Sequence, residues 1–277
     1  MKKILVPVDF SEHSEFALEV AAQLAREHDA EIVALHMMGL SPSILTKDES
    51  QEVFEAMYYL KLAEKRFNEF LDKPYLKGVK VESMVQNYKI FKEVNEVAKD
   101  MDADLIIMGS HGTSGVKEVF VGSNTEKVVR TSDIPVLVIK NRAMNFNMKK
   151  MVFACDFSEE FVPVFRKARK LADTFGAEFQ LLYINTPERF LRTGDMKQKA
   201  FQFLLKGEDR DMDLYPEVKY YCDMTVEDGI FSYSNDSKAD VIAVPTHGRR
   251  GLAHFFVGSI GENVVNHSDL PIIALKI

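Results

Sequence analysis

Short apolar runs alternate along the chain with segments of helical periodicity. Several of the apolar runs lack polar alternation, which is typical of parallel strands buried on both faces. The pattern therefore predicts an open, doubly wound α/β fold with helices on both faces of a parallel sheet. In the first half we expect strands at residues 4–8, 31–37, 79–85, 104–109 and 135–140 and helices after Ser11 and over residues 52–71 and 90–100.

The same pattern occurs twice. "ILVPVDFSEHSEFAL" is echoed by "MVFACDFSEEFVPVF" 147 residues later, whereas "DIPVLVIK" is echoed by "DLPIIALK" 136 residues later. The second copy is therefore 11 residues shorter, and the loss lies between Met37 and Asp102 in terms of the first copy. We interpret the chain as two tandem domains, residues 1–140 and 150–277, joined by a polar linker at 141–149.

Composition excludes some classes of protein. The 277 residues carry a formal net charge of −7, which argues against nonspecific binding to nucleic acid. No uncharged run reaches the length of a membrane-spanning helix, so we expect a cytoplasmic protein with no membrane partner. Cys155 and Cys222 form no metal-binding or redox spacing, and we interpret them as small buried residues.

A glycine-spaced loop follows the fourth expected strand of each copy. In the first copy the spacing is set by Gly109, Gly112 and Gly122, with Ser123 next, and an apolar helical pattern follows. Glycine lets the backbone approach a phosphate closely, and the N–H groups of a helix start attract anions. "SNTE" at residues 123–126 is also a capping box, so Ser123 has a purely structural alternative as a helix cap.

These residues resemble the universal stress protein family in its tandem two-domain form. The resemblance rests on G-x2-G-x9-G-S and on a first strand that ends in an aspartate, and it covers almost the whole chain. It implies five-stranded sheets of order 3-2-1-4-5, dimerisation through the last strand, and binding of ATP in members with the full glycine motif.

The resemblance also implies the roles of individual residues. Asp9 and the backbone of Met37 would hold the adenosine, and Gly109 and Gly112 would let the loop approach the phosphates. Gly122, Ser123 and Asn124 would meet the phosphates at a helix start. The expected site comprises Pro7, Val8, Asp9, Met37, Met108, Gly109, His111, Gly112, Gly122, Ser123 and Asn124, and Asp9 is also the candidate ligand for Mg²⁺ carried with the nucleotide.

The second copy departs from the motif at its first position, where Pro245 replaces glycine. Proline has no N–H and a fixed φ, so binding is weakened if the loop needs a donor or a flexible residue there. It is tolerated if only its carbonyl faces the ligand. A second site would comprise Asp156, Ile184, Val244, Gly248, Gly258, Ser259 and Ile260.

The leading functional hypothesis is a stress protein that binds ATP or AMP and acts as a nucleotide-dependent sensor or regulator. No lysine stands in the loop where a P-loop has one, which favours binding over fast phosphoryl transfer. We expect no catalytic residues, because His111 and His247 have no evident nucleophile or orienting partner. The alternatives are an interaction module without nucleotide and a weak ATPase.

Assembly follows from the last strands. "IPVLVIK" and "LPIIALK" are apolar, and such edges are seldom left bare. We expect them to pair within one chain as a pseudo-dimer, and two chains to associate further as a homodimer. Residues 39–57, trimmed in the second copy, are a candidate lid or contact surface.

Overall fold

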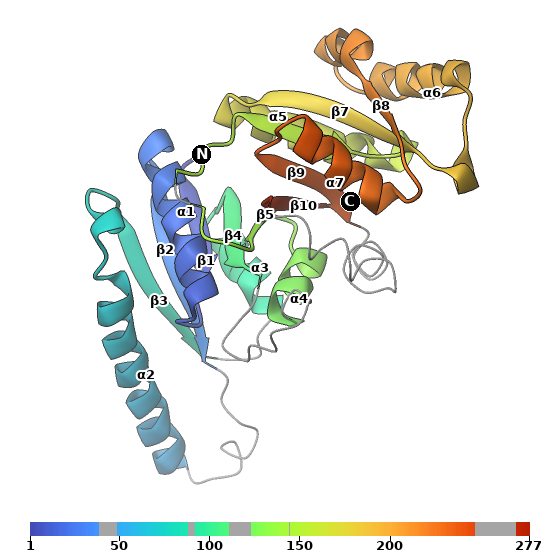
Figure 1. The fold of residues 1–277 in the computed structure, drawn as a ribbon. Coiled ribbons are helices and arrows are strands. Elements are labelled where there is room, and N and C mark those ends of the chain that lie inside the picture. The colour runs from blue at the N-terminus through green and yellow to red at the C-terminus, as the bar shows by residue number, and fades with distance from the viewer. Residues whose placement is uncertain (39–48, 88–91, 111–122, 144, 247–269) are drawn as a thin grey trace. The chain divides into compact units, whose positions relative to one another are not determined.

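The computed structural model describes residues 1–38, 49–87, 92–110, 123–143, 145–246 and 270–277 (Figure 1). The described residues up to Phe146 form one compact unit, and those from Asn147 onward form another. Each unit is described by itself below as unit 1 and unit 2.

Unit 1 is a five-stranded parallel sheet with helices between the strands. Its strand order is β3-β2-β1-β4-β5, and each neighbouring pair runs parallel. The strands and helices occur where the periodicity predicts them. In chain order they are β1 (Lys3–Pro7), α1 (Glu12–His28), β2 (Glu31–Met38), α2 (Glu49–Leu71), the 3-10 turn η1 (Pro74–Leu76), β3 (Val81–Asn87), α3 (Lys92–Asp100), β4 (Leu105–Gly109), α4 (Ser123–Thr131) and β5 (Val136–Ile139).

Unit 2 repeats this topology. Its order, β8-β7-β6-β9-β10, is the same 3-2-1-4-5 arrangement counted within the unit, and its strand pairs are also parallel. The elements are β6 (Lys150–Ala154), η2 (Glu159–Phe161), α5 (Val162–Phe175), β7 (Glu178–Asn185), η3 (Pro187–Arg189), α6 (Thr193–Leu205), η4 (Asp209–Glu217), β8 (Lys219–Cys222), α7 (Val226–Asp236), β9 (Val241–Thr246) and β10 (Ile272–Lys276).

The strand order determines where the helices lie. The chain steps outward from β1 to β3, then crosses back to β4 and continues outward to β5. Because crossovers between parallel strands are right-handed, the helices of these two series cover opposite faces of the sheet. The direction changes between β1 and β4, and in open α/β sheets ligands bind at the carboxyl ends of the strands at such a point.

Helix α1 begins and ends at residues whose chemistry suits those positions. The Ser11 side chain accepts the N–H of Ser14, with Glu12 and Glu15 in the first turn, where the helix dipole favours negative charge. The helix ends at Asp29, whose φ is 50°. The corresponding position in unit 2 is Gly176, which has a φ of 63° and ends α5.

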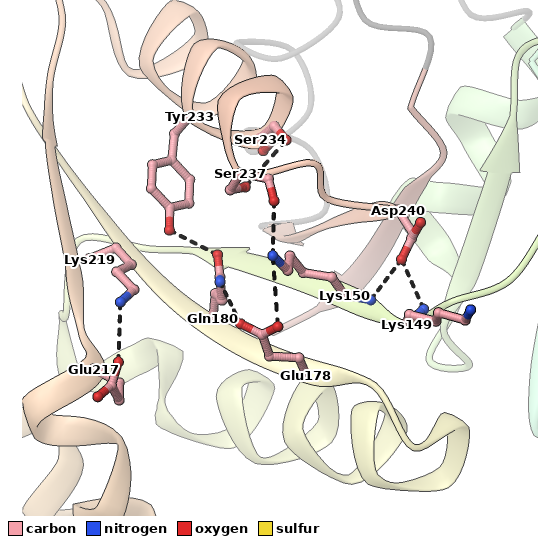
Figure 2. A network of polar contacts seen from close by, with 10 residues as sticks. All are labelled: Lys149, Lys150, Glu178, Gln180, Glu217, Lys219, Tyr233, Ser234, Ser237 and Asp240. Carbon is pink, nitrogen blue, oxygen red and sulfur yellow. Dashed lines mark hydrogen bonds and ion pairs between the residues drawn. The ribbon is translucent and has the colours of Figure 1, made fainter.

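One aspartate in each unit binds backbone at the amino-terminal edge of the sheet, the edge opposite the carboxyl ends of the strands. The Asp104 carboxylate accepts the backbone N–H groups of Lys2 and Lys3 at 2.5 and 3.1 Å. Asp240, 136 positions later, accepts those of Lys149 and Lys150 at 2.9 and 2.8 Å (Figure 2). The repeat inferred from the sequence therefore extends to individual hydrogen bonds.

Lysine 150 extends the network in unit 2. Its ammonium donates to the Ser237 carbonyl at 2.9 Å and lies 3.7 Å from the Glu178 carboxylate. Gln180 in turn bridges Glu178 and the Tyr233 hydroxyl (Figure 2). These contacts tie α7 to the starts of β6 and β7, well away from the carboxyl ends of the strands.

The two cysteines are not both buried, contrary to the expectation from the sequence. Cys155, at the end of β6, is half-buried, and burial raises the pKa of its thiol. Cys222 ends the edge strand β8 and is exposed. The apolar pattern of the second copy could not distinguish an edge strand from a central one.

Substitution of Asp240 with alanine tests the contribution of this anchor to stability. The change leaves two backbone N–H groups without their charged acceptor, so we expect the free energy of unfolding to fall by about 1–3 kcal/mol. Urea unfolding of the full chain measures it. The matched control is Asp213→Ala, which removes an exposed carboxylate and should cost far less. Equal losses in the two variants would contradict the anchor.

Candidate functional site

The hydrogen-bond ladder between β1 and β4 ends before either strand does. The two strands pair at Ile4–Leu105 and Leu5–Ile106, whereas β1 continues to Pro7 and β4 to Gly109. In this parallel register, the next hydrogen bond that β1 donates to β4 would come from the backbone N–H of residue 7. Proline has none, so the pairing of the two strands stops there.

Asp9 follows β1 by two residues and caps a tight turn. Its carboxylate accepts both the backbone N–H and the hydroxyl of Ser11, at 3.1 and 2.6 Å. Phe10, between them, has a φ of 64°, a conformation that costs a bulky residue free energy. Phe157, in the same Asp-Phe-Ser sequence of unit 2, has a φ of 60°. The aspartate therefore has a structural role at this edge in addition to any role toward a ligand.

Gly109 brings the end of β4 against the first turn of α1. A Cβ at this position would lie 2.5 Å from the His13 carbonyl oxygen and 2.6 Å from its carbon, distances that real side chains do not reach. The neighbour is backbone, so it cannot rotate away. Glycine is required here to pack a helix, which is a reason distinct from the approach of a phosphate.

Helix α4 is held to the same point. The Thr125 hydroxyl, in the first turn of α4, is buried and donates to the Gly109 carbonyl at 2.8 Å. This bond places the start of α4 at the carboxyl edge of the sheet. The N–H groups of the first turn of a helix lack intrahelical acceptors, so this position suits an anion.

His36, near the end of β2, connects this strand to β1. Its Nδ1 lies 2.8 Å from the Val8 carbonyl oxygen, which can only accept, so Nδ1 carries the proton. The ring packs on Phe10 at a centroid distance of 4.6 Å. Burial lowers the pKa of His36, the hydrogen bond to Val8 opposes this shift, and the charge of Arg66 adds to the lowering. These contacts give His36 a structural role at this edge.

The other expected residues of the first site lie at the same edge where they are described. Val8 and Met108 are buried, and Val8 donates its N–H to the Leu35 carbonyl at 2.8 Å. Met37 is half-buried in β2, and Asn124 is exposed on α4. Ser123 begins α4, and its side chain lies outside the described atoms. His111, Gly112 and Gly122 lie outside the described residues, as do Gly248, Gly258, Ser259 and Ile260 of the second site.

The carboxyl edge of unit 2 differs from that of unit 1 in its strand pairing. Ala154 stands at the position of Pro7, and β6 and β9 pair one step further, to Phe153–Ala243. The next donor in this ladder would be the N–H of residue 245, which is Pro245. In each unit a proline thus ends the central ladder, but it lies on the first strand in unit 1 and on the fourth in unit 2.

Two further differences accompany Pro245. Helix α5 begins at Val162, after the 3-10 turn η2, whereas α1 begins at the position equivalent to Glu159. A helix turn packed as closely as His13 packs on Gly109 would meet the proline ring. In the sequence Gly261 replaces Thr125, so the hydroxyl that holds α4 to β4 has no counterpart.

A lysine side chain also binds backbone just after the carboxyl end of β6. Lys199, on α6, donates to the Asp156 backbone carbonyl at 2.6 Å and lies 6.0 Å from the centre of the Tyr183 ring. Asp156 itself is exposed and accepts the Ser158 N–H at 2.8 Å. Ile184 and Val244, expected at the second site, are buried near the ends of β7 and β9.

Comparison with known proteins identifies the family. The model of the universal stress protein family matches residues 1–140 and again residues 147–276. This chain belongs to the universal stress protein family. A universal stress protein of Methanocaldococcus jannaschii is 34% identical over 155 residues, which cover 51% of this chain and 96% of that protein. One from Mycolicibacterium smegmatis is 21% identical over 288 residues, covering 99% and 96%.

The family resemblance extends to solved structures. The crystal structure of a universal stress protein from Archaeoglobus fulgidus covers 99% of this chain and 96% of its own, with a TM-score of 0.61 and 20% identity. At this identity the likeness shows the fold alone. The fold of the whole chain is therefore common to both proteins.

Neither a membrane-spanning helix nor a metal cluster occurs among the described residues. No described helix combines the length and the apolar character needed to cross a bilayer. Within the same residues no three His, Cys, Asp or Glu side chains converge as a metal site.

Substitution of Gly109 with alanine tests the packing of β4 on α1. The added methyl group would collide with the His13 backbone, so we expect the free energy of unfolding to fall by about 1–3 kcal/mol. Gly194→Ala is the control, because a Cβ there meets nothing within 4 Å. Thermal or urea unfolding measures both. Unchanged stability of Gly109→Ala would show that the helix does not pack there as described.

The lowered pKa of His36 predicts a dependence of stability on pH. Because the unfolded state binds a proton more readily, stability is highest above pH about 6.5 and falls as the pH drops from there toward the folded pKa. His36→Asn keeps a donor for the Val8 carbonyl and cannot titrate. Urea unfolding between pH 7.5 and 5.5 should show a shallower decline for the variant. Parallel declines would assign the pH dependence to other groups.

Proposed function

We propose that this universal stress protein binds an adenine nucleotide, ATP or AMP, at the carboxyl edge of unit 1 and acts as a nucleotide-dependent sensor or regulator. The observation that carries the proposal is that the pairing of β1 with β4 ends short of their carboxyl ends, at the point where strand order reverses. Bound nucleotide would shift the population of conformations that partners recognise.

The residues at this edge fit a nucleotide. Asp9 offers a carboxylate to ribose hydroxyls or to Mg²⁺ carried with the phosphates, and the backbone of Met37 ends the adjacent strand. The start of α4, held to Gly109 by Thr125, offers N–H groups to an anion. The glycine-spaced loop between them, which includes His111, Gly112 and Gly122, would complete the cradle.

Unit 2 is a weaker candidate for the same ligand. Pro245 removes a donor that Gly109 retains, and in the sequence Gly261 stands at the position equivalent to Thr125. The Lys199 ammonium already lies on the Asp156 carbonyl. We therefore expect the first site to be occupied in preference to the second, which would include Asp156, Ile184 and Val244.

Two other functions are the alternatives. An interaction module without nucleotide would need the glycines only for packing, a role that Gly109 does have. A weak ATPase would use the same site, but the loop sequence lacks the lysine of a P-loop. Pairing of the two last strands within one chain stays a prediction.

Isothermal titration of the full chain with Mg-ATP and with AMP tests the proposal. Asp9→Asn removes the negative charge and keeps an oxygen for Ser11, so we expect the dissociation constant to rise roughly ten- to a hundredfold. Asp156→Asn is the matched control in the second copy and should leave the affinity nearly unchanged. Equal effects of the two variants, or no binding by the wild type, would reject the assignment to unit 1.

A further inference from the structure

His36 joins strand β2 to the residue that precedes Asp9. The paired register of β1 with β2 ends at Pro7 and Leu35. Beyond it, Val8 donates its N–H to the Leu35 carbonyl at 2.8 Å, and its own carbonyl accepts the Nδ1–H of His36 at 2.8 Å. Strand β2 therefore binds both backbone polar groups of Val8, which fixes the chain just before Asp9.

The residue after Asp9 is held by packing. Phe10 has a φ of 64°, and a bulky residue persists in this conformation only where its surroundings determine it. The centroid of its ring lies 4.6 Å from that of His36, 5.1 Å from that of Phe67 and 5.6 Å from that of Phe70. His36 thus contacts the residues on both sides of Asp9, one through a hydrogen bond and the other through its ring.

The aspartate itself is bound differently in the two units. The half-buried Asp9 carboxylate accepts both the N–H and the hydroxyl of Ser11. The described contacts of the Asp156 carboxylate, which is exposed, comprise one bond, from the N–H of Ser158. Unit 1 therefore holds its carboxylate in place more firmly.

Unit 2 retains the aromatic contact without the hydrogen bond. Tyr183 stands at the position of His36, 147 residues later, and its ring stacks on Phe157 at a centroid distance of 5.3 Å. Tyrosine has no donor at the position of Nδ1. The backbone bond that Cys155 donates to β7 is 3.2 Å long, against 2.8 Å for its counterpart in unit 1. The Nδ1 donor, rather than the ring, is the feature that distinguishes unit 1.

We propose that His36 is a positioning residue of the nucleotide site: its bond to the Val8 carbonyl holds the backbone that presents the Asp9 carboxylate to the ligand. The proposal rests on the proposed function of unit 1. A carboxylate that is held in place before the ligand arrives loses less conformational freedom on binding, and affinity rises accordingly. His36 acts through the backbone and does not touch the nucleotide.

Substitutions that separate the donor from the ring test this role. His36→Phe and His36→Tyr retain an aromatic ring against Phe10 and remove the Nδ1 donor, and unit 2 already accommodates tyrosine at this position. We expect the dissociation constant for Mg-ATP, measured by isothermal titration of the full chain, to rise about tenfold in both. His36→Asn removes the ring but retains an N–H donor near the position of Nδ1, so its dissociation constant should stay within about threefold of the wild type.

The matched control is Tyr183→Phe, which alters the same position in unit 2 and should leave the affinity of unit 1 unchanged. A purely structural role predicts the reverse order at His36, because the asparagine variant loses the packing on Phe10 and would bind most weakly. That order, or wild-type affinity in both ring variants, would overturn the positioning role while leaving the nucleotide site in place. No binding of Mg-ATP by the wild type would instead overturn the proposed function, and the positioning role with it.

Discussion

A parallel ladder cannot continue through a residue that has no N–H where the register requires one. In unit 1 that residue is Pro7, and the pairing of β1 with β4 stops just before it. The two strands lie at the centre of the sheet, where strand order reverses. At the same carboxyl edge lie the turn at Asp9, the close contact of Gly109 with His13, and the start of α4.

The pairing of the two central strands ends at a different position in each copy. Unit 2 has Ala154 in place of Pro7 and Pro245 in place of Gly109, so its ladder is one step longer and ends on the other strand. The late start of α5 and the loss of the Thr125 hydroxyl accompany this exchange. The differences that the structure describes, in strand pairing and in the start of α5, both lie at the carboxyl edge, and from them we infer that the copies have diverged in what they bind.

The sequence was sufficient for the architecture because that depends on periodicity. The strands, the helix that begins after Ser11 and the repeat from Asp104 to Asp240 all follow from spacing alone. The local geometry of the carboxyl edge does not follow from the spacing of residues. The left-handed conformation of Phe10 is one that its residue type disfavours. The contact between Gly109 and His13 and the bond from His36 to Val8 join segments far apart in sequence. Single-chain patterns carry no signal for such contacts, although the repeated Asp-Phe-Ser marks where to look.

The asymmetry between the copies is the central claim, and the number of nucleotides bound per chain tests it most directly. Native mass spectrometry of the full chain, with Mg-ATP in excess over a range of concentrations, counts them. We predict one nucleotide per chain over most of the range, in unit 1. Two bound together at low concentration would contradict the divergence of unit 2, and none at millimolar ATP or AMP would contradict the site itself.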